Sequence, residues 1–178
     1  MASLDEELKK QQIQEWYQVY SDEIYRFILI LLGDHEQAKD LTHDTFLKAY
    51  QYLDHFKGET SDKNWLYRIA RNITIDYLRK RKPLRYLSDS FKAFPANHDT
   101  PEKITQLGEA ERQLYLSLSR LKRSYREVII LRKIKELSIR ETAEVLAWSE
   151  GKVKTTLLRG MKALKIQMQK EGYDHETT

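Results

Sequence analysis

The stretch from Asn64 to Lys82 constrains the fold of this 178-residue chain more than any other, because its pattern is that of one long helix with two different faces. At about 100° per residue, the apolar side chains fall together on one side: Leu66, Ile69, Ala70, Ile73 and Tyr77. The opposite side gathers Arg68, Arg71, Arg79 and Lys82, with Asn64 and Asn72 beside them and Trp65 at the flank. This pattern predicts a helix that packs on a helical core and presents a basic outer face.

Charge is strongly segregated along the chain. Residues 63–85 carry eight basic residues and one acidic residue, a net charge of +7 in a chain whose total is +4. The net charge is −7 over residues 1–62, −2 over residues 86–119, +9 over residues 120–170 and −3 over the last eight residues. The basic charge of residues 63–85 alone would also be consistent with a helix face that is simply exposed to solvent. Two basic surfaces between acidic ones nevertheless favour a polyanion as the binding partner. Nucleic acid is a better candidate than a membrane surface, because the apolar residues opposite the cations are expected in the core and are not left to enter a membrane.

Composition excludes several classes of protein. The chain has no cysteine, which rules out disulfides, zinc–thiolate sites and a cysteine nucleophile. Its longest apolar run, Phe27 to Leu32, is far shorter than the ~20 residues that a membrane span needs. No signal peptide is recognisable, so we expect a soluble, cytoplasmic protein that does not insert into a membrane and needs no cofactor.

Helical periodicity over most of the chain predicts an all-α fold of two small helical domains. The first domain is expected over residues 1–83, a linker over residues 84–100, the second domain over residues 101–170 and a tail over residues 171–178. In the first domain we expect a helix over Leu4–Tyr20, a second that starts at a cap on Ser21 or Asp22 and ends at Gly33, and a third over His35–Tyr52. The central helix follows a cap at Ser61 or Asp62. In the second domain we expect helices over Pro101–Ser119 and Ser124–Lys135.

The third helix carries a cluster of three polar residues, Asp40, His43 and Asp44, that has two interpretations. Their spacing suits a metal ion, and the His-Asp pair resembles that of helical metal-dependent phosphohydrolases. Such a site needs further His and Asp ligands, and the other histidines fall in caps, loops and the tail. We therefore favour a solvated or partner-facing acidic surface without a metal.

The second basic block contains the most specific pattern. Ser138 and Glu141 form a predicted capping box before a short helix that ends at Leu146. A turn at Ala147 and Trp148 leads to Ser149, the predicted cap of a last helix that reaches about Gln169. This is the spacing of a helix-turn-helix. The outer face of the last helix would present Gly151, Lys152, Thr155, Arg159 and Lys162, with Lys154 at its edge, to phosphates and base edges in a major groove.

Three motifs in this order resemble the extracytoplasmic-function (ECF, group IV) sigma factors of bacterial RNA polymerase. Residues 40–46, DLTHDTF, are similar to the family pattern D-L-x-Q-E-x-F, and they are followed by residues 65–72, WLYRIARN, and by Asp76. Residues 137–159 resemble the pattern L-S-x-x-E-I-A-E-x-L-G-x-S-x-G-T-V-K-S-R-L. The similarity spans about Trp16 to Lys170, and the family has two promoter-binding helical domains joined by a flexible linker.

Five positions depart from these patterns. His43 and Asp44 replace Gln and Glu, which keeps that surface polar and acidic. Ala147 replaces the usual glycine, at a cost of about 1 kcal/mol if the turn needs a positive φ. Lys152 and Thr156 replace Thr and Arg on the reading helix, so the recognised DNA sequence does not carry over from relatives.

The resemblance implies an alternative sigma factor and assigns roles to its surfaces. The third helix would dock on core RNA polymerase through Asp40 and Asp44 foremost, with Phe46 and Lys48. The central helix would engage the promoter element nearer the start site (−10), and the loop Phe56–Asp62 would hold a base flipped from the melted strand. Contacts to that element would come from Lys57, Arg68, Arg71, Asn72, Arg79 and Lys82, while Trp65 would stack on a base, wedge the duplex or pack in the core.

The helix-turn-helix would read the farther element (−35) as duplex through Ser149, Gly151, Lys152, Lys154, Thr155, Arg159 and Lys162. The polymerase would perform the chemistry, and the chain itself would not be an enzyme. A further implied partner is an anti-sigma factor, often membrane-anchored in this family. A stand-alone helix-turn-helix regulator remains the main alternative, although it would leave the central basic helix and the acidic face without a role.

Overall fold

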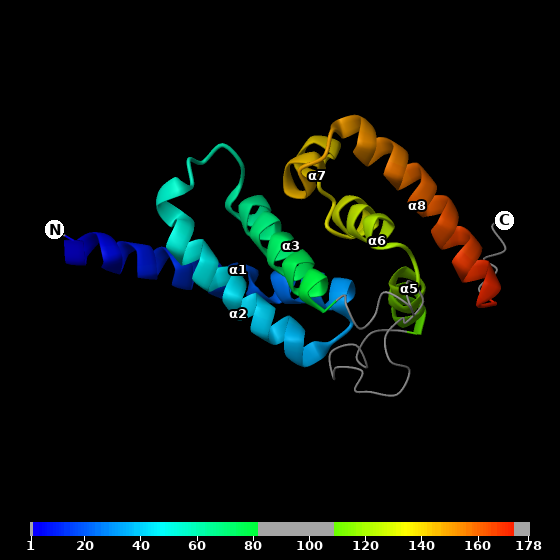
Figure 1. The fold of residues 1–178 in the computed structure, drawn as a ribbon, viewed down its shortest axis with the longest axis horizontal. Helices are drawn as coiled ribbons and strands as arrows, with labels where there is room; N and C mark the ends of the chain where they lie inside the picture. Colours follow the sequence, from blue (N-terminus) through cyan, green and yellow to red (C-terminus); the bar gives the residue numbers. More distant parts are fainter. Residues whose placement is uncertain (1, 82–108, 173–178) are drawn as a thin grey trace. The chain divides into compact units, whose positions relative to one another are not determined.

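Figure 1 shows the computed structural model of the chain, which describes residues 2–81 and 109–172. Within these ranges every regular element is a helix, so the predicted all-α fold is confirmed. The helices form two compact units, one ending at Arg81 and a second that contains most of residues 109–172. The predicted linker over residues 84–100, the predicted helix start at Pro101, and Lys82 lie outside the described residues.

The first helix, α1 (Ala2–Leu32), is continuous. The sequence predicted two helices here with a cap at Ser21 or Asp22, and this prediction was wrong. A capping side chain starts a helix only where the preceding backbone leaves helical geometry. Buried residues keep their helical spacing across the expected break, from Trp16 to Ile24, so packing holds the backbone in one helix.

The second helix, α2 (His35–Tyr52), has the predicted bounds. Gly33 separates it from α1 with a φ of +73°, a conformation that costs glycine little, and donates its N–H to the carbonyl of Leu29 at 2.7 Å. Asp34 caps α2 by accepting the N–H of Gln37 at 3.1 Å. These local signals explain why the boundary was predictable.

The third helix, α3 (Asp62–Lys80), follows a single 3-10 turn over Leu53–His55 and an irregular segment. Ser61 caps it by accepting the N–H of Asn64 at 3.2 Å. We call residues 53–61, which connect α2 to α3, the connecting loop. In Figure 1 this loop (teal) leads into the amino-terminal end of α3.

The core of the first domain lies where α1, α2 and α3 pack on one another. Phe27 meets Tyr67 edge to face, with 5.2 Å between the ring centroids. The Tyr67 hydroxyl donates to Glu23 at 3.0 Å, and burial, with Glu23 beside it, raises the pKa of Tyr67. Side chains buried in this domain include Ile24, Phe27, Ile28, Leu31, Ala38, Leu41, Ala49, Leu66, Tyr67 and Ala70.

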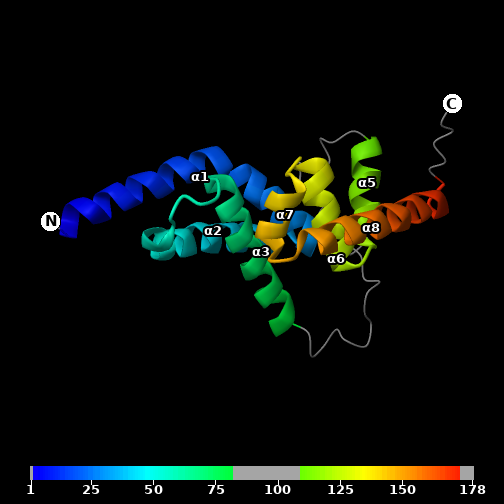
Figure 2. The same cartoon turned by 90° about the horizontal axis from the view of Figure 1, so that it is seen from above.

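The second domain comprises α5 (Glu109–Ser119), α6 (Arg123–Ile129), α7 (Ile139–Leu146) and α8 (Glu150–Lys170). A π-helical turn over Ile130–Ile134 continues α6, so the single helix predicted from Ser124 to Lys135 is present with a widened last turn. Figure 2 shows α8, orange to red, passing beside both α6 and α5.

Two contacts position α8 against its neighbours. A Cβ added at Gly160 would lie 3.3 Å from Ile129 Cδ1 and from Tyr125 Cβ, so glycine permits a close crossing of α6 and α8. Just past α8, Glu171 accepts hydrogen bonds from Ser117 of α5 at 2.5 Å and from Gln167 at 2.9 Å, and pairs with Arg120. Burial opposes ionisation of Glu171, but these donors together lower its pKa.

Candidate functional site

The helix-turn-helix forms as the sequence predicted. Ser138 accepts the N–H of Glu141 at 3.0 Å, and the Glu141 carboxylate accepts the N–H of Ser138 at 2.7 Å, which completes the capping box of α7. Ala147 ends α7 in the left-handed region, with φ 56° and ψ 43°. The turn therefore needs the conformation that suits glycine, and alanine adopts it at a cost of about 1 kcal/mol.

The start of α8 is capped and basic. Ser149 caps it by accepting the N–H of Lys152 at 3.1 Å. The Lys152 ammonium lies 4.4 Å from the centroid of the Trp148 ring, a cation–π contact that ties it to the turn. The remaining residues predicted to read DNA, Gly151, Lys154, Thr155, Arg159 and Lys162, are exposed on α8, whereas Val153 and Leu164 are buried on its other side.

Sequence reasoning missed one residue on this reading face. Leu158 is 61% exposed, and its helical position falls between those of Lys154 and Thr155 on the outer side of α8. A leucine in a periodic helix is normally assigned to the core, which explains the omission. An exposed aliphatic side chain among cations suits the methyl group of thymine in a major groove.

The basic face of α3 differs from the predicted one in its orientation. Arg68, Asn72 and Arg79 are exposed, and Arg71 is half-buried. Asn64 was expected beside these cations, but it is only 5% exposed and belongs to the buried side. The cause is a rotation of the helix about its axis that buries Tyr67 and Thr74. Ile69 and Ile73, expected in the core, are only half-buried.

Hydrogen bonds accommodate the polar groups that this rotation buries. Thr74 donates its hydroxyl to the carbonyl of Ala70 at 2.7 Å, and Tyr67 donates to Glu23, so both polar groups are satisfied in the core. The sequence pattern counted apolar residues and therefore could not place a tyrosine and a threonine inside.

An aromatic cluster formed by Trp16, Phe56 and Trp65 stands at the start of α3. The centroids of Trp16 and Phe56 are 5.7 Å apart, those of Trp16 and Trp65 are 5.9 Å apart, and those of Phe56 and Trp65 are 4.8 Å apart. Trp65 is half-buried in this cluster. Of the interpretations that the sequence left open for Trp65, the structure shows packing against neighbours. Beside the cluster, Lys57 and Gly58 are exposed in the connecting loop.

The outer face of α2 combines acidic residues with an apolar groove. Asp40, Asp44 and Lys48 are exposed. Phe46, predicted to contact a partner, is 3% exposed and packs against Tyr17 with 5.0 Å between centroids. Phe46 is therefore a core side chain that lines the floor of the groove, and its contact with a partner stays a prediction. Helical periodicity alone had placed it next to the core-facing side.

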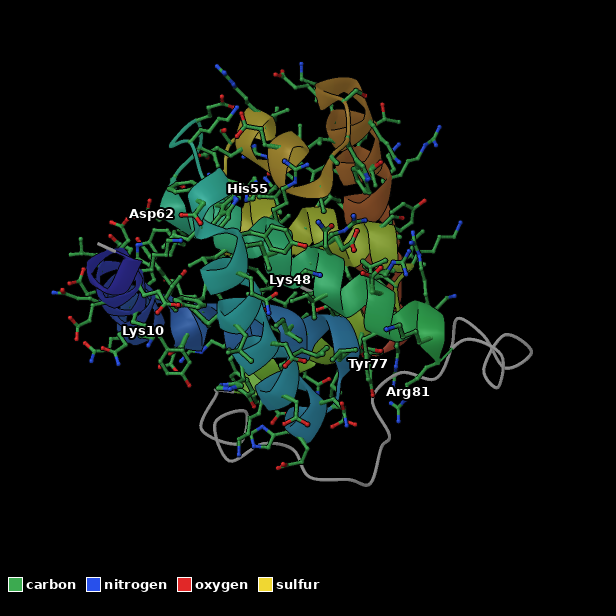
Figure 3. All side chains as sticks on the ribbon, turned by 60° about the vertical axis from the view of Figure 1, so that its left-hand side comes forward. Lys10, Lys48, His55, Asp62, Tyr77 and Arg81 are labelled. Carbon is green, nitrogen blue, oxygen red and sulfur yellow. The ribbon has the colours of Figure 1, made fainter. Side chains whose placement is uncertain are left out.

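The groove between α1 and α2 has a volume of about 660 Å³. Its most exposed apolar residues are Leu47, at 50% exposure, and Tyr17, at 46%. The complete lining is Lys10, Ile13, Gln14, Tyr17, Gln18, His43, Phe46, Leu47 and Tyr50. In Figure 3, Lys10 on α1 and Lys48 on α2 mark the two helices that border it. Sequence reasoning missed this groove because it forms only when two helices pack.

The structure also bears on metal binding and membrane insertion. Among residues 2–81 and 109–172, no three His, Asp or Glu side chains are grouped to hold a metal ion, and this includes Asp40, His43 and Asp44. None of the helices that the structure describes is long and apolar enough to cross a membrane.

Two family profiles match the chain in the order of its domains. The profile described as Sigma-70 region 2 matches residues 16–83, and the profile described as Sigma-70, region 4 matches residues 111–164. The first match runs from the aromatic cluster to the end of α3. The second contains α7, the turn and α8 as far as Leu164.

Curated relatives match over most of their length. The chain is 34% identical over 163 residues to the ECF RNA polymerase sigma factor SigX of Bacillus subtilis, covering 86% of this chain and 81% of that protein. It is 36% identical over 160 residues to the RNA polymerase sigma factor YlaC of the same bacterium, covering 89% and 92%. Among solved structures, the sigma factor RpoE in complex with the anti-sigma factor NepR from Bartonella quintana shares the fold, with a TM-score of 0.74, 23% identity, and coverage of 89% and 98%.

Proposed function

The chain belongs to the extracytoplasmic-function sigma factors of bacterial RNA polymerase, and we propose how its surfaces divide the work of an alternative sigma factor that directs transcription initiation. The outer face of α2 docks on core polymerase. The connecting loop and α3 engage the promoter element nearer the start site. The α7–α8 helix-turn-helix reads the farther element as duplex. We retain residues 1–83 and 101–170 as the two functional domains.

The observation that carries this proposal is the chemistry of α2 in a chain that also has two basic surfaces. Asp40 and Asp44 are exposed beside an apolar groove. The two carboxylates would repel DNA, and the groove offers DNA no favourable contact. An acidic face next to exposed Leu47 and Tyr17 suits a protein partner with basic and apolar side chains. A regulator that bound DNA alone would leave this surface without a role.

The two DNA-facing surfaces suit different forms of the promoter. On α8, a capped helix presents Lys154, Arg159 and Lys162 from one face, as an intact major groove requires. On α3, Arg68 and Asn72 are exposed, and the connecting loop before this helix adds a further exposed cation, Lys57. Proteins bind a melted strand with cations that follow its phosphate backbone and with a pocket that holds an unstacked base.

A regulatory partner is also proposed. Two structures with a similar fold, RpoE in complex with the anti-sigma factor NepR and CnrH in complex with the cytosolic domain of CnrY, each contain a second protein bound to the chain that matches this one. We propose that an anti-sigma factor, which a membrane anchor would hold at the cell envelope, restrains this chain until a signal releases it. The sigma factor itself would work in the cytoplasm and perform no catalytic step.

The test is reconstitution with core polymerase. Purified chain and core enzyme are expected to co-elute, and the complex should start transcription at discrete sites on a genomic fragment library in a run-off assay. Core enzyme alone is the control. A stand-alone regulator would bind duplex DNA without core polymerase, would not co-elute with it, and would start no new transcripts.

A further inference from the structure

The first helix touches the connecting loop and the start of α3 at three successive points. Lys9 pairs with Asp54 at 2.5 Å, where the loop begins. Trp16 packs edge-on against Phe56, inside the loop. Glu23 pairs with Lys63 at 2.9 Å, just after the loop ends. The order along α1 therefore matches the order along the loop.

The three residues of α1 are spaced by seven, which places them along one side of a continuous helix. At about 1.5 Å per residue, consecutive contacts lie roughly 10 Å apart along the axis. This spacing depends on α1 remaining helical between Trp16 and Glu23, through the region where the sequence had indicated a break at Ser21. Uninterrupted, the helix acts as a continuous support against which the loop is fixed.

The middle contact is the strongest of the three. Trp16 is buried and also meets Trp65 of α3, so one side chain joins α1, the loop and α3. Aromatic pairs of this geometry contribute about 0.5–1.5 kcal/mol each beyond the area that they bury. The two ion pairs are partly exposed and add little stability, but they fix where each end of the loop lies.

The tip of the loop is left open by these contacts. Lys57, Gly58 and Glu59 are exposed, and Gly58 has a φ of +70°, with no atom within 4 Å of the place where a Cβ would stand. Figure 3 shows His55 and Asp62, which flank this tip, at one end of α3, with Tyr77 and Arg81 at the other end. A tip that is free for contact but anchored on both sides loses little conformational entropy when it binds.

We propose that Lys9, Trp16 and Glu23 are positioning residues that hold the connecting loop in the shape that captures a displaced base of single-stranded promoter DNA. This inference rests on the proposed function, in which that loop contacts the melted strand. None of the three residues needs to touch DNA. They act through Asp54, Phe56 and Lys63. Substitution of Lys9, Trp16 or Glu23 should therefore loosen the loop without changing the helix-turn-helix.

The experiment exchanges the charges of the first ion pair. Lys9→Asp and Asp54→Lys each place like charges opposite one another, and the double exchange restores an ion pair. The two single changes alter the net charge in opposite directions. If both weaken DNA capture, a general electrostatic effect of the protein on DNA cannot be the cause.

Two readouts are needed on the full chain. Hydrogen exchange measures the order of residues 53–61. Fluorescence anisotropy of the holoenzyme measures capture of a labelled single-stranded oligonucleotide, enriched from a random pool by the wild-type holoenzyme. We expect each single change to speed loop exchange and to weaken capture about three- to fivefold, with recovery in the double exchange. Arg26→Asp, an equal charge change on an exposed residue of α1, should alter neither readout.

A second variant tests the aromatic contact. Trp16→Leu keeps an apolar side chain but removes the edge-on ring contacts, and it should weaken capture more than either charge change. Trp16→Phe should recover part of the loss. Binding of the variants to core polymerase, which is proposed to use α2 of the same domain, should stay at the wild-type value and shows that the first domain is folded.

The possible results separate this inference from the proposed function. Faster loop exchange with unchanged capture, or unchanged loop exchange, would overturn the positioning role of α1. If wild-type holoenzyme enriched no single strand, or if Lys57→Ala, Arg68→Ala and Asn72→Ala all left capture intact, the proposed role of the loop and α3 would fail instead.

Discussion

The two domains present their cations in different ways. On α8, Lys154, Arg159 and Lys162 stand on one exposed face behind a capped turn, so a single helix supplies the whole surface. On α3, Arg68 and Arg79 are exposed and Arg71 is half-buried, and the helix follows a loop that other elements hold in place. A duplex offers a groove of fixed shape, which one rigid helix can fit, whereas a displaced base needs a site assembled from several segments. Similar charge can therefore support different tasks.

The first domain also differs from the second in carrying a surface of opposite chemistry. Asp40 and Asp44 are exposed on α2, the helix that forms one side of the apolar groove. On the second domain, the described outer face of α8 is basic. Core polymerase docking is therefore expected to depend on the first domain more than on α8.

Reversal of charge on α2 should give the largest effect. Asp40→Lys combined with Asp44→Lys is expected to weaken binding to core polymerase about ten- to hundredfold, because two attractive contacts become repulsive. Affinity can be measured by titration of labelled sigma factor with core enzyme. Glu6→Lys with Glu7→Lys makes the same charge change on exposed residues of α1 and should bind normally. Equal affinity of both double variants would refute the assignment of α2.

Single alanine substitutions should separate the two DNA surfaces. Arg159→Ala is expected to cost about 1–3 kcal/mol on duplex carrying the farther element, with relaxed discrimination at one base pair if the side chain reads a base edge. Contact to phosphate alone would give a uniform loss and a shallower dependence on salt. This defect should be the same on closed and pre-melted templates.

Arg71→Ala should behave differently from Arg159→Ala. It is expected to reduce strand opening on closed promoters, and a template with a pre-melted bubble should recover part of the loss, because some of the missing work is strand separation. Permanganate reactivity of unpaired thymines measures opening on matched templates. Identical defects of Arg71→Ala and Arg159→Ala on every template would mean that the domains do not divide the work as proposed.

A smaller effect is expected from the groove. Leu47→Ala removes an exposed leucine from the proposed docking surface and should weaken core binding by about 1–2 kcal/mol, as for an apolar side chain buried at an interface. Leu8→Ala is a matched control, since Leu8 is 57% exposed on α1 and does not line the groove. Equal losses from both changes would remove the groove from the docking surface.

The sequence predicted well those features that depend on neighbours in the chain. The caps at Ser138 and Ser149 are local hydrogen bonds that the structure contains, and the cap expected at Ser61 or Asp62 falls at Ser61. The helix-turn-helix followed from its caps, and the bounds of α2 followed from Gly33 and from helical spacing. Local chemistry also identified Ala147 as the residue at which a glycine conformation would be costly.

Features that depend on tertiary packing were predicted poorly. The continuity of α1 through Ser21 reflects burial on both sides of a capping residue that the helix does not use. The rotation of α3 follows from the bond between Tyr67 and Glu23, which are 44 residues apart. The groove and the aromatic cluster form only when α1 packs on α2 and on the connecting loop. A periodic pattern contains no information on these partners.

The smallest predicted effect concerns the rigidity of the second domain. Ala147 holds a φ of 56°, so Ala147→Gly should relieve about 1 kcal/mol of backbone strain, and up to about 0.5 kcal/mol of stabilisation should remain after the extra flexibility of glycine in the unfolded chain is subtracted. Ala163→Gly makes the same chemical change inside α8, where alanine is favoured, and should destabilise it by about 1 kcal/mol. Native-state hydrogen exchange of amides in α7 and α8 measures both free energies. Ala147 does not belong to the outer face of α8 and makes no proposed contact with DNA. Ala147→Gly should therefore raise the affinity for the farther promoter element only if stability of the turn limits binding to the duplex. Destabilisation by both glycines would show that the turn is unstrained, and that the rigidity of this domain has another origin.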